Sequence, residues 1–428
     1  MNVARDPAAA GVSPRIRKPW MPADGLAFTV FLGALSALPP LSIDMGLPGI
    51  PAIEACVSGA ASHGALTLSL FLAGFSVSPL CCGPFADRFG RRATMAVGLL
   101  IFALAAGACV LAQGFALLLA CRLVQGVAAG ACVIMPLAIV RDVFDGADAR
   151  HHLSRITAVV GLAPMLAPVL GNWVMAVGGW RAIYGAQAAC GVLLLVATLT
   201  LFGETLPIAR RRRLDPAVLL GGYAMVVRNR AFVGNTLLYA FAFACMFSFI
   251  SSAPAVLMGV IGLSTGTFAL AFAVSSCGTL LGALLSGRLN ARGVSSATIV
   301  NASVIGLVVS AGAILLVVLT GAAQVGTIVP LVALAIFCFG LIGPSASHAA
   351  LSGLPQVAGS ASGVLRCTQM VLGATASALV AWLAPFGQPL LVMAILMVAT
   401  SLAAATCLVA LRAGGRREIH THIKEDPA

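Results

Sequence analysis

Three charged residues lie within long apolar stretches of the sequence: Asp44, Arg122 and Arg366. Charged side chains inside a membrane-spanning segment are costly, and by default they indicate an ion or substrate pathway. A carboxylate can bind and release a proton, whereas an arginine stays charged. Since no Asp or Glu occurs between Asp215 and Glu418, we expect any proton-exchanging carboxylate in the membrane to be in the N-terminal half. Asp44 is the candidate residue for proton exchange, and Arg122 is a buried charge that could lie near it.

The segment around Asp44 is rich in proline, with Pro39 and Pro40 before it and Pro48 after it. Prolines remove backbone donors and kink or unwind a helix, which leaves polar backbone groups free to line a cavity. Asp44 is near the outer end of its span, and Arg122 is roughly 10 Å deep in its own span at 1.5 Å per residue, so we expect similar depths. The alternatives are a solvated span end for Asp44 and a purely structural hydrogen-bond donor for Arg122.

The composition excludes an ordinary soluble protein. Of 428 residues, 60% are hydrophobic and 9% are charged, against about 25% charged in soluble domains. The net charge of +12 indicates basic cytoplasmic loops rather than binding to nucleic acid. The 12 cysteines lack the spacing of metal ligands, and no nucleotide-binding glycine loop occurs. We therefore expect no enzymatic activity, no cofactor and no metal.

Hydropathy predicts an all-α membrane protein with twelve transmembrane helices of roughly 20 residues each. The predicted spans lie near residues 25–48, 65–85, 93–112, 115–139, 156–178, 182–203, 233–257, 265–287, 296–320, 325–345, 358–383 and 388–411. An alternative for the first apolar stretch is a cleaved signal peptide.

The spans form two six-helix halves, 25–203 and 233–411, around a basic cytoplasmic linker at 204–232. Tails of 1–24 and 412–428 flank the halves. Two halves of similar length are typical of secondary transporters with parallel repeats, whose substrate sites lie near mid-membrane between the repeats. Basic residues concentrate in the tails, the linker and alternate loops, which predicts that both termini are cytoplasmic.

Four motifs, in this order, resemble the bicyclomycin/chloramphenicol resistance (Bcr/CflA) group of the major facilitator superfamily. They are Asp44-Met-Gly-Leu-Pro48, Gly83-Pro-Phe-Ala-Asp87-Arg88-Phe-Gly90-Arg91-Arg92, Arg122-Leu-Val-Gln125-Gly126 and Ala163-Pro164-Met-Leu-Ala167-Pro168-Val-Leu-Gly171. The resemblance covers about residues 25 to 412. It implies two six-helix pseudo-repeats around a central cavity and a monomeric drug:proton antiporter of the bacterial inner membrane, powered by the proton gradient.

The resemblance also assigns roles to the motif residues. A cytoplasmic gate motif comprises Gly83, Asp87, Arg88, Gly90, Arg91 and Arg92, joined by Arg141 and Asp142. The helix-4 motif consists of Arg122, Gln125 and Gly126, and the resemblance links its arginine, together with Asp44, to proton coupling. The antiporter motif consists of Pro164, Pro168 and Gly171. We expect Gly83 to permit close helix approach and Asp87 to bind the N-terminus of the eleventh span near Ser360, in one conformation only. The alternative is that the loop only anchors the topology.

Departures from the family pattern are Gly46, where an aromatic residue is frequent, and Asn172, where a second glycine is usual. Among weaker signals, we expect His151 and His152 to be solvated. His348 is either a helix-end residue or a proton relay.

The cavity-lining candidates are Met246, Phe247 and Arg366. Aromatic and methionine side chains in a cavity accept amphipathic molecules, although such a stripe more often packs helices together. Arg366 either lines the cavity or pairs with backbone carbonyls. We expect a proton-coupled exporter of small amphipathic drugs. The alternatives are export of an endogenous metabolite, such as an amino acid, and a non-transporting membrane sensor.

Overall fold

The computed structural model describes residue 21 and residues 25–211 and 215–425. This part of the chain is helical throughout, apart from loops and one isolated bridge between Ser58 and Gly114. The N-terminal half contains α1 (Leu26–Asp44), α2 (Ile50–Cys56), α3 (Leu66–Phe89), α4 (Arg91–Leu111), α5 (Phe115–Val143) and α6 (Gly146–Thr200). The C-terminal half contains α8 (Arg230–Ala253), α9 (Thr265–Ala291), α10 (Ser296–Leu319), α11 (Val325–Leu351), α12 (Ala358–Leu383) and α13 (Pro389–Glu425).

Eleven helices in the described residues are long and apolar enough to cross a membrane. One of them, α6, has 55 residues and is interrupted by non-helical backbone at Gly178 and Gly179. Gly179 has φ +67°, a conformation that glycine adopts without the steric cost of a side chain. Because α6 therefore holds two of the predicted spans, the eleven helices provide twelve crossings. The predicted twelve-helix fold is confirmed.

The basic linker contains a helix, α7 (Pro216–Arg228). Asp215 caps this helix by accepting hydrogen bonds from the backbone N–H groups of Ala217 and Val218, and Pro216 occupies the first turn. Both are favourable at a helix N-terminus. Tyr223 donates a 2.8 Å hydrogen bond to the carbonyl of Leu80, so α7 is held against α3.

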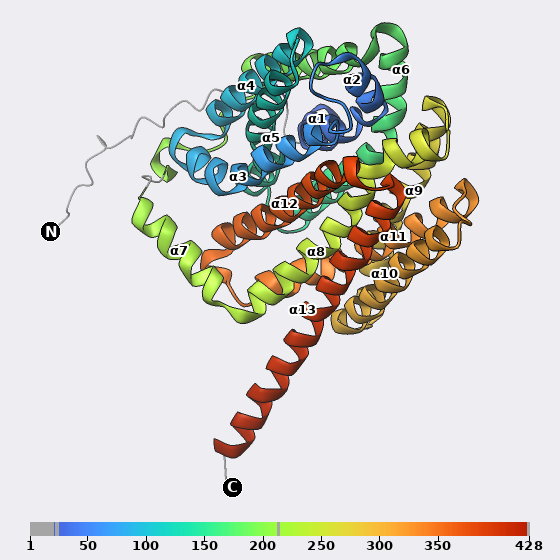
Figure 1. Cartoon of the computed structure of the whole chain (residues 1–428). Helices are drawn as coiled ribbons and strands as arrows, with labels where there is room; N and C mark the ends of the chain where they lie inside the picture. The colour runs from blue at the N-terminus through green and yellow to red at the C-terminus, as the bar shows by residue number, and fades with distance from the viewer. Residues whose placement is uncertain (1–20, 22–24, 212–214, 426–428) are drawn as a thin grey trace, which may run out of the picture.

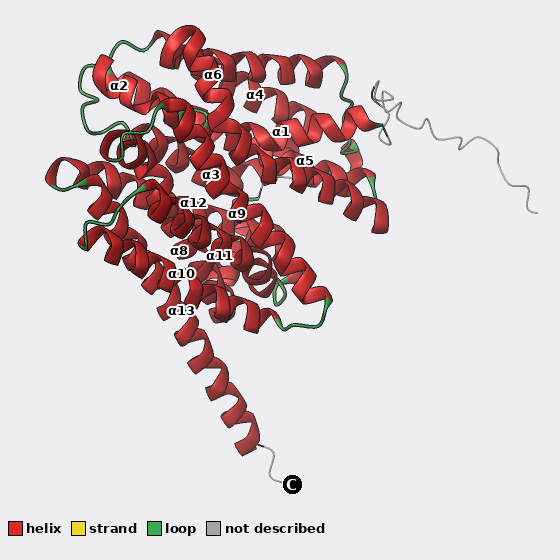
Figure 2. Ribbon diagram, turned by 90° about the vertical axis from the view of Figure 1, so that its right-hand side faces the viewer, coloured by secondary structure: helices red, strands yellow, loops and turns green. Residues whose placement is uncertain are grey.

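The two halves lie side by side, with α1 to α6 in one group and α8 to α13 in the other (Figure 1 and Figure 2). In the first half, Gly126 of α5 lies against the backbone of Phe71 in α3. In the second half, Gly340 of α11 lies against the backbone of Thr279 in α9. A Cβ at either glycine would overlap the opposite backbone, so small residues permit both close contacts. Close helix packing at a glycine therefore occurs in both halves.

The halves meet where α3 packs against α12 and α6 packs against α9. Ser69 of α3 donates a 2.7 Å hydrogen bond to Ser377 of α12. Further along the same pair of helices, Gly363 faces the carbonyl of Pro79. The interface on this side is built from small side chains.

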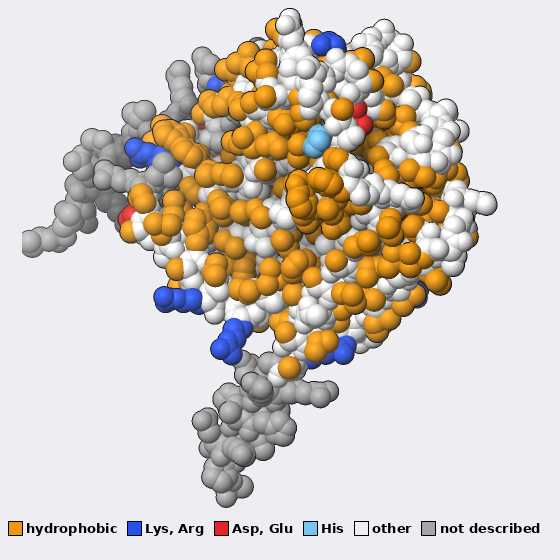
Figure 3. All heavy atoms as spheres, viewed as in Figure 1, with side chains coloured by type: hydrophobic (Ala, Val, Ile, Leu, Met, Phe, Trp, Pro, Cys, Tyr) orange, Lys and Arg blue, Asp and Glu red, His pale blue; other side chains and the backbone are white. Residues whose placement is uncertain are grey.

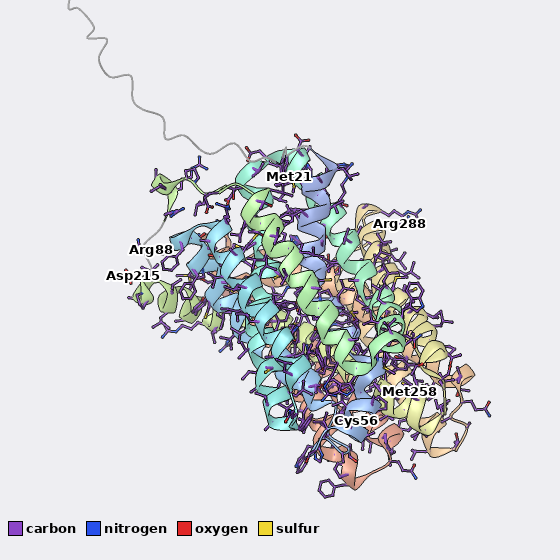
Figure 4. All side chains as sticks on the ribbon, turned by 90° about the horizontal axis from the view of Figure 1, so that it is seen from above. Met21, Cys56, Arg88, Asp215, Met258 and Arg288 are labelled. Atoms are coloured by element: carbon purple, nitrogen blue, oxygen red, sulfur yellow. The ribbon has the colours of Figure 1, made fainter. Side chains whose placement is uncertain are left out.

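Hydrophobic side chains cover most of the face shown in Figure 3, and Lys and Arg side chains lie at its edges. Figure 4 places Met21, Arg88 and Arg288 towards one end of the helices, and Cys56 and Met258 towards the other. The basic loops of the two halves therefore share one side, as the charge pattern of the sequence predicts.

Candidate functional site

Asp44 is the last residue of α1 and is 4% exposed. Its Oδ1 atom has no hydrogen-bond partner among the described residues. Buried polar atoms are nearly always paired in native proteins, so an unpaired carboxylate oxygen calls for an explanation. Pro39 and Pro40 lie inside the same helix, and α1 ends immediately after the proline-containing turn.

Arg122 of α5 is 3% exposed and makes three hydrogen bonds, two to other helices and one within its own helix. Its Nη2 donates to the carbonyl of Ser42 in α1 (3.3 Å), its Nε to the carbonyl of Thr67 in α3 (3.2 Å), and its Nη1 to Oε1 of Gln125 (2.7 Å). The guanidinium also lies over the ring of Phe71, 4.4 Å from its centroid, a favourable cation–π position.

The expectation that Arg122 reaches the level of Asp44 agrees with this geometry, because Ser42 is two residues before Asp44. Arg122 forms no ion pair among the described residues, however. It binds the backbone beside Asp44 rather than the carboxylate.

Gln187 in the second part of α6 completes this network, and the sequence analysis missed it. Its Oε1 accepts a 2.9 Å hydrogen bond from Gln125, and its Nε2 donates over 3.4 Å to the same Ser42 carbonyl. The last carbonyls of a helix lack intrahelical donors, and cations are favourable at that end. Arg122 and Gln187 therefore cap α1 at the turn that carries Asp44. The sequence offered one indication of this role, because Gln187 is an uncharged amide in an otherwise apolar stretch.

The antiporter motif packs against the residue that follows this turn. A Cβ at Gly171 would overlap the carbonyl of Met45, the residue that follows Asp44. Met45, Ala167 and Ile183 form a small buried cluster. Pro168 is buried and Pro164 is half-buried. Residues from the first, fourth, fifth and sixth spans thus converge on the end of α1.

The gate motif forms a charge cluster centred on Arg91. Nη1 of Arg91 lies 2.6 Å from Oδ1 of Asp87, and its Nε lies 2.9 Å from Oδ2 of Asp142. The backbone N–H of Arg91 donates to Glu204 over 2.8 Å, which ties the start of α4 to the segment after α6. Arg92 donates to the carbonyls of Thr198 and Leu199, while Arg88 and Arg141 are exposed.

Two contacts that the sequence predicts for this motif are not present in this conformation. Asp87 pairs with Arg91 rather than with the N-terminus of α12, where Ser360 instead faces Gly222 of α7. The reason proposed for Gly83 is wrong for this conformation, because a Cβ there would meet no atom within 4 Å. Gly90, by contrast, has φ +97° and lies against the Glu204 carboxylate, so a side chain would be both strained and obstructed.

The cavity-lining candidates occupy different environments. Phe247 is 3% exposed, and its ring centroid lies 4.5 Å from that of Phe243, which favours the helix-packing alternative for this residue. Met246 is half-buried. Arg366 is exposed and donates a 3.3 Å hydrogen bond to Oε1 of Gln369, so its recorded partner is a side chain rather than a backbone carbonyl.

His152 corrects the expectation that both loop histidines are solvated. His151 is exposed, but His152 is buried. The ring of His152 stacks on Phe144 at 4.1 Å and is hydrogen-bonded to the Thr29 hydroxyl at 3.1 Å. His348 is exposed near the end of α11. No three metal-ligating side chains come together in the part of the chain that the structure describes.

Two helical halves with a buried charged network in one of them define a membrane transporter fold. The family model of the Major Facilitator Superfamily matches residues 25–376, and the chain belongs to this family.

Relatives and solved structures agree with this assignment. The chain is 29% identical to the uncharacterized MFS-type transporter YdgK of Bacillus subtilis, over 83% of this chain and 88% of that protein. It is 31% identical to the multidrug resistance protein MdtL of Escherichia coli O45:K1, over 58% of this chain and 63% of MdtL. A bacterial homologue of the human lysosomal transporter Spinster, solved in an inward-facing and unoccupied conformation, has a similar fold. That comparison has a TM-score of 0.70 at 17% identity and covers 90% of this chain and 96% of the other.

Proposed function

We propose that this transporter is a proton-coupled multidrug exporter of the Bcr/CflA group, with both termini on the cytoplasmic side of a bacterial inner membrane. The observation that carries the proposal is the buried Asp44 carboxylate, whose Oδ1 has no partner in the described residues, at a helix end capped by Arg122. The four sequence motifs and the similarity to MdtL, a protein named for multidrug resistance, support it.

The chemistry of the site suits proton exchange. An ionised carboxylate buried without donors is expensive, whereas its protonated form carries no net charge. A change in the access of water to Asp44 therefore changes which form is favoured. Arg122 and Gln187 hold the adjacent Ser42 carbonyl, so a movement of α1 and a change in the charge of Asp44 affect the same small network.

In the proposed cycle, Asp44 takes up a proton from the outside and loses it when substrate binds from the cytoplasm. Each proton that enters down a potential of 100 mV supplies about 2.3 kcal/mol. This energy favours export several tens of fold, at about 1.4 kcal/mol per factor of ten. The proton gradient is the energy source, and no cofactor takes part.

The gate cluster supplies the conformational bias in this proposal. Arg91 holds Asp87 and Asp142 together at the cytoplasmic end. Asp87 is still 43% exposed on its side chain and is free to exchange partners as the halves rock. A contact made in one state only shifts the equilibrium between states.

The test measures the uptake of a panel of drugs and amino acids into inside-out vesicles that hold a proton gradient. In such vesicles, uptake corresponds to export from the cell. Asp44→Asn keeps the volume of the side chain but removes the exchangeable proton, so we expect it to lose drug accumulation against a gradient. Asp145→Asn, at an exposed position between α5 and α6, is the matched control. Wild-type exchange of drug for protons by Asp44→Asn would refute the coupling role. Accumulation of amino acids but not drugs would establish the metabolite exporter instead.

A further inference from the structure

Arg366 lies on the face of α12 that points towards the rest of the protein. On an α-helix with 3.6 residues per turn, Arg366 is within about 20° of Gly373 and Ser377. Gly373 lies against the ring of Phe243 in α8, and Ser377 accepts a hydrogen bond from Ser69 in α3. Arg366 therefore projects between a helix of its own half and a helix of the other half.

The opposite face of α12 is the one that faces outwards. Val371 and Trp382 are 43% and 63% exposed, and they lie about 140° and 160° from Arg366 around the helix. Arg366 is also exposed, although its own sector otherwise holds buried residues. Its exposure is therefore not that of a residue on the outward-facing side of α12.

The charge of Arg366 has no counter-ion in the described residues. Its recorded partner is the amide of Gln369, a residue that is 1% exposed. The ion pairs among the described residues all involve the gate cluster and its neighbour Arg211. The chain has no Asp or Glu from residue 216 to residue 417, so the C-terminal half offers no carboxylate within its spans.

Arg366 lies in the part of α12 nearer the N-terminus of the helix. Arg366 is eight residues after the start of α12, roughly 12 Å along the helix. The Ser69–Ser377 contact lies eleven residues further on, roughly 16 Å beyond Arg366, and it joins the two halves on the outer side. Arg366 thus lies between this contact and the contact of Gly363 with the carbonyl of Pro79, about one turn nearer the start of α12.

We propose that Arg366 binds an anionic group of the transported molecule, and that the substrates are amphipathic molecules that carry a carboxylate or a similar anionic oxygen group. A guanidinium presents a fork of donors that matches a carboxylate geometrically. Gln369 holds one arm of this fork and leaves its other donors free for the ligand. The inference rests on the proposed export function and specifies its substrate class.

Two related dyes test this inference without relying on transport. Rhodamine B carries a free carboxylate, which is an ethyl ester in rhodamine 6G, and binding of each to the full-length protein in nanodiscs is measured by fluorescence anisotropy. We expect the wild-type protein to prefer rhodamine B. Arg366→Gln should weaken rhodamine B binding about tenfold, as expected for loss of a charge-assisted hydrogen bond, and should change rhodamine 6G binding less than twofold.

Arg366→Lys retains the charge and should keep most of the preference for the carboxylate. Arg288→Gln, which changes an exposed arginine at the end of α9, is the matched control, and thermal unfolding checks that each variant is folded. Equal binding of the two dyes by the wild-type protein, or equal losses for both dyes in Arg366→Gln, would overturn the inference. Because no proton gradient is present, failure of proton-coupled export appears in the vesicle experiment and not in this one.

Discussion

Gly171 of α6 lies against the backbone carbonyl of Met45, the residue that follows the buried Asp44 in α1. This contact connects the antiporter motif to the proposed proton site through the main chain. The backbone on either side of Asp44 in the sequence is thereby held by two contacts, that of Gly171 with Met45 and that of Arg122 with the Ser42 carbonyl. A change at either contact should displace the Asp44 carboxylate.

Gly171→Ala should impair proton-coupled transport, because its methyl group overlaps the Met45 carbonyl. Overpacking of this kind costs about 1–3 kcal/mol, and the local remedy is a displacement of the end of α1. Gly107→Ala in α4 is the control, since a Cβ there meets no atom within 4 Å. Efflux and expression are measured for both variants. Normal efflux by Gly171→Ala would mean that the end of α1 tolerates displacement.

The two carboxylates bound by Arg91 should contribute differently to the thermal stability of the protein and to its transport rate. The side chain of Asp142 is 19% exposed and that of Asp87 is 43% exposed. Exposed ion pairs contribute about 0–1 kcal/mol, and removal of one partner costs more as burial increases. Asp142→Asn should therefore lower the thermal stability of the purified protein more than Asp87→Asn does. Asp87→Asn should mainly slow transport, and the opposite ranking in melting temperature would contradict the arrangement.

The neighbouring histidines at the start of α6 provide an internal comparison. His152→Ala removes a buried ring that stacks on Phe144 and binds Thr29, and it should lower the free energy of unfolding by about 1–3 kcal/mol. His151→Ala, at an exposed position, should stay within about 0.5 kcal/mol of the wild type. Thermal denaturation in detergent compares the two variants. Similar melting temperatures would show that the buried ring contributes no net stability.

Reporter fusions test the proposed orientation. A reporter that is active only in the cytoplasm should be active when it is fused after Asp215, beside the basic linker. It should be inactive when it is fused after Val57, at the end of α2, because basic segments remain on the cytoplasmic side. Activity at Val57 would reverse the orientation and place Asp44 near the cytoplasm.

Sequence reasoning succeeded where one residue type is unusual in its surroundings. Twelve spans follow from apolar runs, and the break at Gly178 and Gly179 coincides with the predicted gap between two of them. Asp44 and Arg122 were noticed because charge is rare in such runs. Both are buried at the same end of α1.

Contacts between residues that are distant in sequence could not be predicted in the same way. Thr29 and His152 are separated by 123 positions, and nothing local indicates that they meet. Gln187 resembles many other polar residues in spans until the Ser42 carbonyl is seen to need donors. No other helix in the described part of the chain approaches Gly83 in this conformation, and a glycine in a motif does not itself reveal whether another helix is close.

The glycine contacts between α3 and α5, and between α9 and α11, divide the effects of substitutions into two kinds. Helix backbones in direct contact cannot slide past one another without a steric clash, so each half should move as a rigid body. The halves meet partly through small hydroxyl side chains such as Ser69 and Ser377, which can separate with no repacking inside either half. Substitutions at these glycine contacts should therefore decide how much protein survives in the membrane, and substitutions between the halves should decide how many times each molecule turns over per second.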